Sequence, residues 1–332
     1  MRKLGIFGLG VAAWMAAAAS ASATENWKLA TAAQPGSVLY DVITAFIEDF
    51  NREMNGEIEM EFQFVGNEQE MTQQVIRGRL QMGATSLAGA GVAVPEGTVM
   101  NLPYAWENDA ERAFVTDEFV LPVLQDLYAA KGLMLYEVAD VGWNDVVCTF
   151  ACLTPADVDG IKARISPSPA SKIFWQRMQA NGVQMPLSEA WPALETGLVV
   201  AADLPFLYYI TTPAAQSAPH YVLTRHYHHP SAWIINARLY NGLTDKQKEI
   251  LARVKPDTAA TRQMVADTEK PKMAEFVAQG GFVHELTDEQ RSQWAELVIP
   301  GQQEMVDVIG GRAQEVYDAI QEGKKAWAAK NN

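Results

Sequence analysis

The chain has 332 residues, of which 48% are hydrophobic and 20% are charged, a composition typical of a soluble globular protein. It excludes disordered, collagen-like and disulfide-rich classes, and at about 150 residues per domain the length predicts two domains. Lys and Arg number 26 against 40 Asp and Glu, for a formal net charge of −14. Because no long basic run occurs, we expect no binding to nucleic acid. A small anionic ligand stays possible, since one buried arginine outweighs distant, screened surface charge.

The N-terminus has the pattern of an export signal. Arg2 and Lys3 precede an apolar, alanine-rich run over residues 4–19, and Ala21-Ser22-Ala23 fits the small-residue cleavage pattern. We therefore predict a signal peptide over residues 1–23, cleaved near Ala23, and an exported, periplasmic product. The alternative is an uncleaved membrane anchor, for which the run is short.

The two cysteines, Cys148 and Cys152, lie four positions apart. A zinc site would need two more ligands, and no His, Asp or Glu lies between or immediately beside them, so we expect no metal. In an oxidising compartment a disulfide is the better interpretation. It requires a tight turn, because extended chain would hold the two Cα atoms beyond disulfide reach.

The first third of the mature chain alternates strands and helices. A strand over 27–32 is followed by a helix that Ser37 caps and that Asn55-Gly56 ends. Apolar and polar residues then alternate over 58–64, which predicts a half-buried strand. A helix over 70–79 and a strand over 81–85 complete a pattern that predicts an α/β fold with a parallel sheet.

The pattern continues to the C-terminus. Thr244 with Gln247 and Thr287 with Gln290 have the spacing of capping boxes at helix starts. The remaining expected elements are helices over 117–131, 170–180 and 248–254, strands over 133–141 and 161–165, an extended segment over 221–235, and a helical tail to 330 broken near Gly301, Gly310 and Gly311.

Enzyme motifs are absent from the sequence: it contains no G-x-S-x-G, no H-E-x-x-H, no P-loop and no dinucleotide-binding glycine pattern. We therefore expect no catalysis and no cofactor. His226, His228 and His229 are close enough in sequence to suggest a metal site. We favour an exposed or partly packed polar strand instead, because no carboxylate lies nearby in sequence and His229 would point away from the other two.

Aromatic residues are frequent after the midpoint, and most of them belong in a core. Aromatic side chains together with one cation are also a way to hold a small organic anion in a closing cleft. The residues concerned are Trp143, Trp175, Trp191, Phe206, Tyr208, Tyr209, Tyr221 and Trp233.

Residues 154–165, TPADVDGIKARI, resemble the "tPeDlkGlKiRv" segment of the solute-binding proteins of TRAP transporters, the DctP family. Further matches follow in the family's order over essentially the whole mature chain. They are Phe64-Val65-Gly66-Asn67 with Glu70, Gly78, Met82-Gly83, Leu102-Pro103-Tyr104, residues 185–189 (MPLSE), residues 193–197 (ALETG), His226, and Leu243 with Gln247.

The resemblance implies a two-lobed α/β fold of the periplasmic-binding-protein type, with a central cleft, crossing hinge strands and long C-terminal helices. We expect the first lobe to comprise 24–141 plus about 230–268, and the second 142–229 plus about 269–332. The family's signature arginine, which pairs with the ligand carboxylate, corresponds to Arg164. A guanidinium suits this role because its planar fork gives a carboxylate two charge-assisted hydrogen bonds. Lys162 is the competing cation.

Two departures from the family pattern bear on the ligand. Gly142-Trp143-Asn144 replaces a segment that often carries a second basic group, and Asp203 lies in an otherwise apolar stretch. They argue against C4-dicarboxylates and sialic acid, and favour a monocarboxylate, with aromatic and 2-oxo acids as candidates. Asp203 could also meet a positive group of a zwitterion. The expected ligand-binding residues are Arg164, Asn67, Glu70, Ser86, Trp143, Asn144, Pro186, Asp203, Phe206 and Tyr209.

The function implied is that of an extracytoplasmic receptor. It would bind a small organic acid as a monomer and deliver it to a TRAP permease with a small and a large membrane subunit. The alternatives are the receptor of an ATP-driven importer, which has similar lobes, and a binder of zwitterions or sulfonates.

Overall fold

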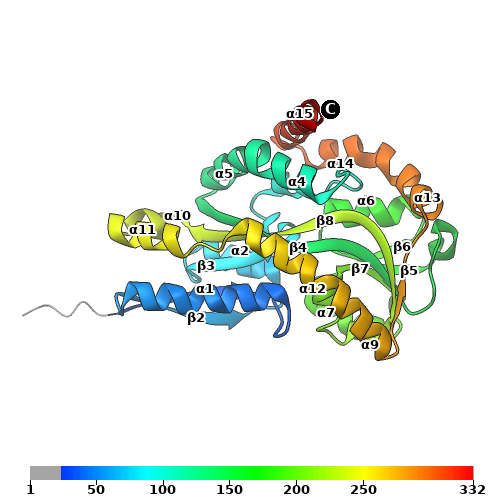
Figure 1. Cartoon of the computed structure of the whole chain (residues 1–332), viewed down its shortest axis with the longest axis horizontal. Coiled ribbons are helices and arrows are strands. Elements are labelled where there is room, and N and C mark those ends of the chain that lie inside the picture. The colour runs from blue at the N-terminus through cyan, green and yellow to red at the C-terminus, as the bar shows by residue number, and fades with distance from the viewer. Residues whose placement is uncertain (1–23, 332) are drawn as a thin grey trace, which may run out of the picture.

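The computed structural model describes residues 24–331, so the predicted signal peptide lies outside the described residues. One mixed sheet in the order β2-β1-β3-β8-β4-β7-β5-β6 runs through the molecule, and β9 pairs with β8 (Figure 1). Between residues 24 and 331 no helix is long and apolar enough to cross a membrane.

The first lobe is built on three parallel strands: β1 (Glu25–Thr31), β2 (Ile58–Phe64) and β3 (Met82–Ser86). The helix α1 (Val38–Met54) begins where Ser37 accepts a hydrogen bond from the backbone N–H of Tyr40, and it ends at Asn55 in the left-handed conformation. The sequence predicted both ends, and it also predicted the alternating strand that became β2.

Two long strands connect the halves of the sheet. β4 (Leu133–Cys148) and β8 (His220–Asn236) pair antiparallel along most of their length, with register shifts between Asp140 and Trp143 and between Asn144 and Val146. β8 also pairs with β3 of the first lobe, and β4 pairs with β7 of the second. These strands are the crossing hinge segments that the family resemblance implied.

The second lobe contains β7 (Ala201–Pro205), β5 (Lys162–Ile165) and β6 (Asn181–Gln184), and β5 pairs parallel with both of the others. Cys148 at the end of β4 forms a disulfide with Cys152, with Cα atoms 6.4 Å apart. The lobe's helices are η3 (Pro155–Val158), α6 (Pro169–Arg177), α7 (Leu187–Glu195), α8 (Phe206–Tyr209) and α9 (Ala214–Ser217).

Most remaining helices cover the first lobe or link the two. Both predicted capping boxes are present, at the starts of α11 and α13. The helix expected over 117–131 is divided, because one π-helical turn precedes α5. These elements are α2 (Glu68–Ile76), α3 (Leu87–Ala90), η1 (Pro95–Asn101), α4 (Asp109–Val115), η2 (Thr116–Val120), α5 (Leu121–Ala130), α10 (Ala237–Gly242), α11 (Asp245–Val254), α12 (Thr258–Ala278), β9 (Phe282–His284), α13 (Asp288–Val298), η4 (Ile299–Gly301), α14 (Gln302–Ile309) and α15 (Ala313–Asn331).

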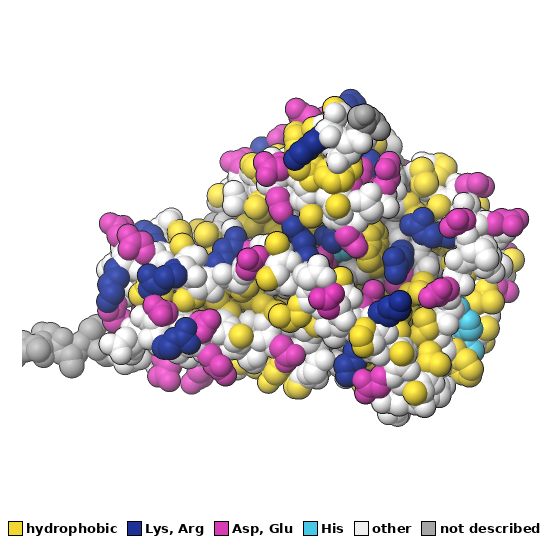
Figure 2. Space-filling view, in the orientation of Figure 1, with side chains coloured by type: hydrophobic (Ala, Val, Ile, Leu, Met, Phe, Trp, Pro, Cys, Tyr) yellow, Lys and Arg dark blue, Asp and Glu magenta, His cyan; other side chains and the backbone are white. Residues whose placement is uncertain are grey.

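Two long C-terminal helices differ in what they contact. α12 crosses the face of the molecule and contacts α1 and β4 as well as α8 and β9 (Figure 1). α15 packs on η1, η2 and α4. We therefore propose that residues 313–331 belong with the first lobe, and we keep the other predicted boundaries as proposals. On the face shown in Figure 2, acidic and basic side chains are interspersed over the surface.

Candidate ligand-binding pocket

A pocket lies between the two lobes. The first lobe supplies the β1–α1 connection, the start of α2 and the end of β3, and the second lobe supplies the ends of β5 and β7 and the start of α7. The two lobes approach each other beside the pocket: a Cβ added to Gly66 would lie 3.4 Å from Cβ of Ser188 on α7. The lining residues are Thr31, Ala32, Ala33, Leu39, Glu68, Gln69, Ala84, Ser86, Ala88, Val141, Asn144, Arg164, Ser166, Pro167, Leu187, Asp203, Leu204, Pro205, Tyr208, His229 and Ser231.

Arg164 is the cation of this pocket. It sits on β5 and is 3% exposed, yet its side chain makes no hydrogen bond or ion pair with any group between residues 24 and 331, and its Nε is buried without a partner. Burial lowers the pKa of Arg164, against the attraction of Asp203. A buried charge without a counter-ion is costly, so this position favours a bound anion. Lys162, the competing candidate, is exposed and lies outside the lining.

Asp203 is saturated with hydrogen bonds from the protein. Its Oδ1 accepts from Ser171 and Trp175 at 2.8 and 2.9 Å, and its Oδ2 accepts from Nδ2 of Asn144 at 2.9 Å and from the hydroxyl of Tyr227. Burial raises the pKa of Asp203, but His226, Arg164 and the Tyr227 hydroxyl outweigh burial and hold the pKa below its usual range. Because four protein donors already bind its oxygens, we expect Asp203 to orient the pocket wall and not to bind a cationic group of the ligand.

The histidine prediction was wrong for two of three residues. His226 and His228 are buried, not exposed or partly packed. Nε2 of His226 lies 3.9 Å from Oδ2 of Asp203, and Nε2 of His228 lies 2.6 Å from Oδ1 of Asp140. These carboxylates come from other strands, which is why no acid was visible nearby in the sequence.

His229 is the third histidine and lines the pocket. Burial, together with repulsion from His228 and Arg164, lowers the pKa of His229 to about 4. The ring is therefore neutral at neutral pH. Arg164 is then the single charged cation in the described lining.

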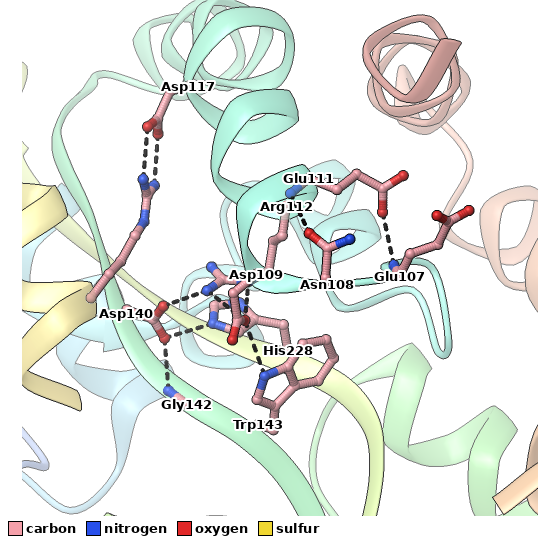
Figure 3. Close-up of polar contacts among 11 residues, drawn as sticks. Glu107, Asn108, Asp109, Glu111, Arg112, Asp117, Asp140, Gly142, Trp143 and His228 are labelled. Atoms are coloured by element: carbon pink, nitrogen blue, oxygen red, sulfur yellow. Dashed lines mark hydrogen bonds and ion pairs between the residues drawn. The ribbon is translucent and has the colours of Figure 1, made fainter. Parts of the chain in front are cut away.

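Trp143 points away from the pocket, into a polar cluster on the other side of β4 (Figure 3). Its indole N–H donates to Oδ1 of Asp109 at 3.2 Å, and Arg112 bridges Asp109 and Asp140 at 3.1 and 2.7 Å. Asp140 also accepts from the N–H of Gly142, within the register shift of β4. The structure thus places Trp143 in this polar cluster and not in the pocket lining.

The first-lobe wall differs from prediction by one or two positions. Asn67 caps α2, and Glu70 is exposed; neither lines the pocket. The next residue after the cap, Glu68, faces the pocket and accepts hydrogen bonds from N–H and Oγ of Ser86 at 2.7 and 2.6 Å. Ser86 lies in the lining, as expected.

The second-lobe wall shows the same offset. Pro186 is replaced in the lining by Leu187, and Tyr209 is replaced by Tyr208. Phe206 and Tyr209 are buried in the core, where the Tyr209 hydroxyl donates to the carbonyl of Ala218 at 2.7 Å. Arg164, Asn144, Asp203 and Ser86 are therefore the predicted residues that the fold brings to the pocket, and Glu68, Tyr208 and His229 are those that sequence reasoning missed.

Comparisons with known proteins agree with this geometry. The family model described as "Bacterial extracellular solute-binding protein, family 7" (DctP) matches residues 29–307. The ectoine/5-hydroxyectoine-binding periplasmic protein of Ruegeria pomeroyi is 24% identical over 317 residues, which cover 92% of each chain. The C4-dicarboxylate-binding periplasmic protein of Rhodobacter capsulatus is 28% identical over 239 residues, which cover 70% of this chain and 71% of that protein.

The same fold is found in solved structures. The sugar acid binding protein of Advenella mimigardefordensis, in complex with galactonate, superposes with a TM-score of 0.84 at 20% identity, covering 90% of this chain and 99% of that one. A TRAP periplasmic solute binding protein from Roseobacter denitrificans, with bound β-D-glucuronate, gives a TM-score of 0.82 at 23% identity, covering 90% and 99%. The two-lobed fold is confirmed, and the chain belongs to the DctP family of TRAP-type solute-binding proteins, family 7.

Proposed function

We propose that this protein is a receptor that binds a small organic acid between its lobes and delivers it to a TRAP permease. The observation that carries the proposal is Arg164, a buried guanidinium in the pocket with no partner between residues 24 and 331. A ligand carboxylate would supply the missing charge and two parallel hydrogen bonds. Closure of the lobes around it would then present one shape to the membrane subunits.

The ligand we propose is a monocarboxylate. Arg164 is one fixed cation, His229 is neutral, and Glu68 adds a negative charge to the opposite wall. A second carboxylate would find no second cation in the described lining and would lie near Glu68. The walls are formed largely by small or aliphatic side chains such as Ala32, Ala88 and Val141, and Tyr208 is the aromatic residue of the lining, so a compact ligand fits better than an aromatic one.

A zwitterionic carboxylate is the second candidate, and Glu68 favours it. Glu68 and Arg164 attract each other across the pocket from different lobes. A ligand with a carboxylate at one end and a cationic group at the other would match that polarity. The 24% identical relative from Ruegeria pomeroyi is named for binding ectoine and 5-hydroxyectoine.

The test is calorimetry on the purified mature protein. The ligand set comprises monocarboxylates, dicarboxylates, sulfonates and zwitterions of three to six carbons, measured with wild type and Arg164→Ala. We expect at least one carboxylate to bind the wild type and to lose at least 30-fold in affinity in the variant. Folded Arg164→Ala protein that binds within threefold of wild type would exclude this site.

A further inference from the structure

Three residues of the pocket wall have a side-chain polar atom that is buried from solvent and lacks a hydrogen-bond partner among the described residues. They are Nε of Arg164, Oδ1 of Asn144 and Nδ1 of His229, each buried without a hydrogen bond among the described residues. Native proteins pair the great majority of buried polar atoms, and each exception calls for an explanation. Three exceptions around one pocket indicate that its occupant supplies the missing partners.

One carboxylate, that of Asp203, interacts with all three residues. Asn144 donates to Asp203 at 2.9 Å, and the charge of Asp203 acts on both Arg164 and His229. They come from three strands of one sheet, in which β8 adjoins β4 and the strand of Asp203, β7, lies between β4 and β5. A ligand that contacts Arg164 would therefore lie against the same pocket wall as Asn144 and His229.

Each atom has a defined hydrogen-bonding role. The guanidinium of Arg164 only donates. The amide nitrogen of Asn144 donates to Asp203 and to the Tyr227 hydroxyl, at 2.9 and 2.6 Å, and because a carboxylate only accepts, Oδ1 is the acceptor that has no partner among the described residues. The neutral imidazole of His229 has one donor and one acceptor, and its Nδ1 is buried without a hydrogen-bond partner among the described residues.

We propose that Asn144 and His229 determine specificity by reading a hydroxyl group next to the carboxylate that Arg164 holds, so that the ligands are hydroxy acids. The inference rests on the proposed function. A hydroxyl donates its hydrogen to Oδ1 of Asn144 and accepts a hydrogen from the imidazole. An oxo group accepts only and leaves Oδ1 of Asn144 unpaired, and an unsubstituted carbon leaves both residues unpaired.

The experiment measures affinity ratios rather than affinities. Calorimetry compares matched triplets of three to six carbons, each consisting of the 2-hydroxy acid, the 2-oxo acid and the unsubstituted straight-chain acid. For at least one chain length we expect wild type to prefer the hydroxy acid over the unsubstituted acid by at least tenfold and over the oxo acid by at least threefold. In His229→Phe we expect the first ratio to fall below threefold.

Two further variants keep the test decisive. His229→Gln restores a donor and an acceptor, and we expect it to recover part of the ratio. Lys162→Gln, on the same strand as Arg164 but exposed, should leave the ratio unchanged. A wild-type ratio below threefold, or a ratio that His229→Phe leaves intact, overturns the inference while carboxylate binding stands. If none of the acids binds, the proposed function itself fails.

Discussion

Arg112 and Arg164 are two buried arginines on opposite sides of the hinge strands, and their surroundings differ. Arg112 is 5% exposed and bridges Asp109 and Asp140, while Arg164 is 3% exposed and has no protein partner between residues 24 and 331. The first arginine belongs to a closed set of charges that includes His228, as Figure 3 shows. The second faces a pocket. Burial is common to both, so the absence of an ion-pair partner among the described residues is the reason to propose Arg164, and not Arg112, as the ligand-binding residue.

The largest expected effect is on stability at Arg112. Arg112→Leu leaves Asp140 buried beside His228 without its main cation, and removal of one partner from a buried ion pair costs about 3–5 kcal/mol. Urea denaturation should show this loss with an unchanged dependence on denaturant. Arg312→Gln, which breaks exposed pairs with Asp126 and Glu315, is the control and should cost far less, because exposed ion pairs contribute little. An Arg112→Leu protein as stable as wild type would break the comparison.

Arg164 should show the opposite pattern. Arg164→Leu removes a buried charge that has no ion-pair partner among the described residues, but it also removes a cation that helps to keep Asp203 ionised, so we expect the unfolding free energy to change less than in Arg112→Leu. Ligand binding should fall by about 2–5 kcal/mol, roughly 30-fold to several thousand-fold. Arg164→Lys should also bind poorly, because Lys lacks the planar fork. Calorimetry and thermal melts on the same samples separate the two effects; loss of stability without loss of binding would reverse the assignment.

Because Arg164 is the single charged cation in the described lining, the charge of the ligand should affect its affinity. We expect monocarboxylates to bind at least about tenfold, or ~1.4 kcal/mol, more tightly than C4-dicarboxylates of equal length. Competition calorimetry with butanoate-type and succinate-type ligands tests it. Tighter binding of the diacid would mean that a second cation joins the pocket on closure.

Asp145 is the anionic counterpart of Arg164: it is a buried carboxylate without an ion-pair partner among the described residues. Burial raises the pKa of Asp145 to about 7, although the backbone N–H of Arg225 donates to it at 2.6 Å. A raised pKa means that the folded state holds the proton that the unfolded state releases, so stability is full below the unfolded pKa and is lost as pH rises through 7. We expect a loss of about 1 kcal/mol between pH 6 and 8.

Asp145→Asn is the variant that checks this effect. It removes the titrating group and should remove that part of the slope, measured as unfolding free energy against pH. Asp157→Asn, at an exposed capping box, is the control and should leave the slope between pH 6 and 8 unchanged. An unchanged slope in Asp145→Asn would show that another group titrates.

Local features of the fold were accessible from the sequence. Ser37, Asn55 and the two capping boxes act through neighbours within four residues, and the alternation in β2 reflects one buried face. The family resemblance supplied the architecture and Arg164. Because side chains on a strand alternate between the two faces of the sheet, the face of a residue on β5 follows from its position in the strand.

The pocket walls were harder to predict because helix starts form them. Successive residues of a helix are rotated by about 100° around its axis, so an error of one or two positions selects a side chain on a different face. The motifs pointed to Glu70, Pro186 and Tyr209. The pocket is lined instead by their neighbours Glu68, Leu187 and Tyr208. Nor could local patterns give the partners of His226 and His228. Their carboxylates arrive from β7 and β4 only when the sheet is assembled.

The crossing strands have a consequence for how the chain acquires its structure. The first lobe contains the first strands to be made, yet its sheet continues from β3 to β8, and α15 at the end of the chain covers η1 and α4. No N-terminal portion of the chain therefore holds a complete lobe. Contacts so distant in sequence form slowly, because loop closure must precede them. The first lobe, whose strands are synthesised first, therefore stays incomplete until the last helix exists.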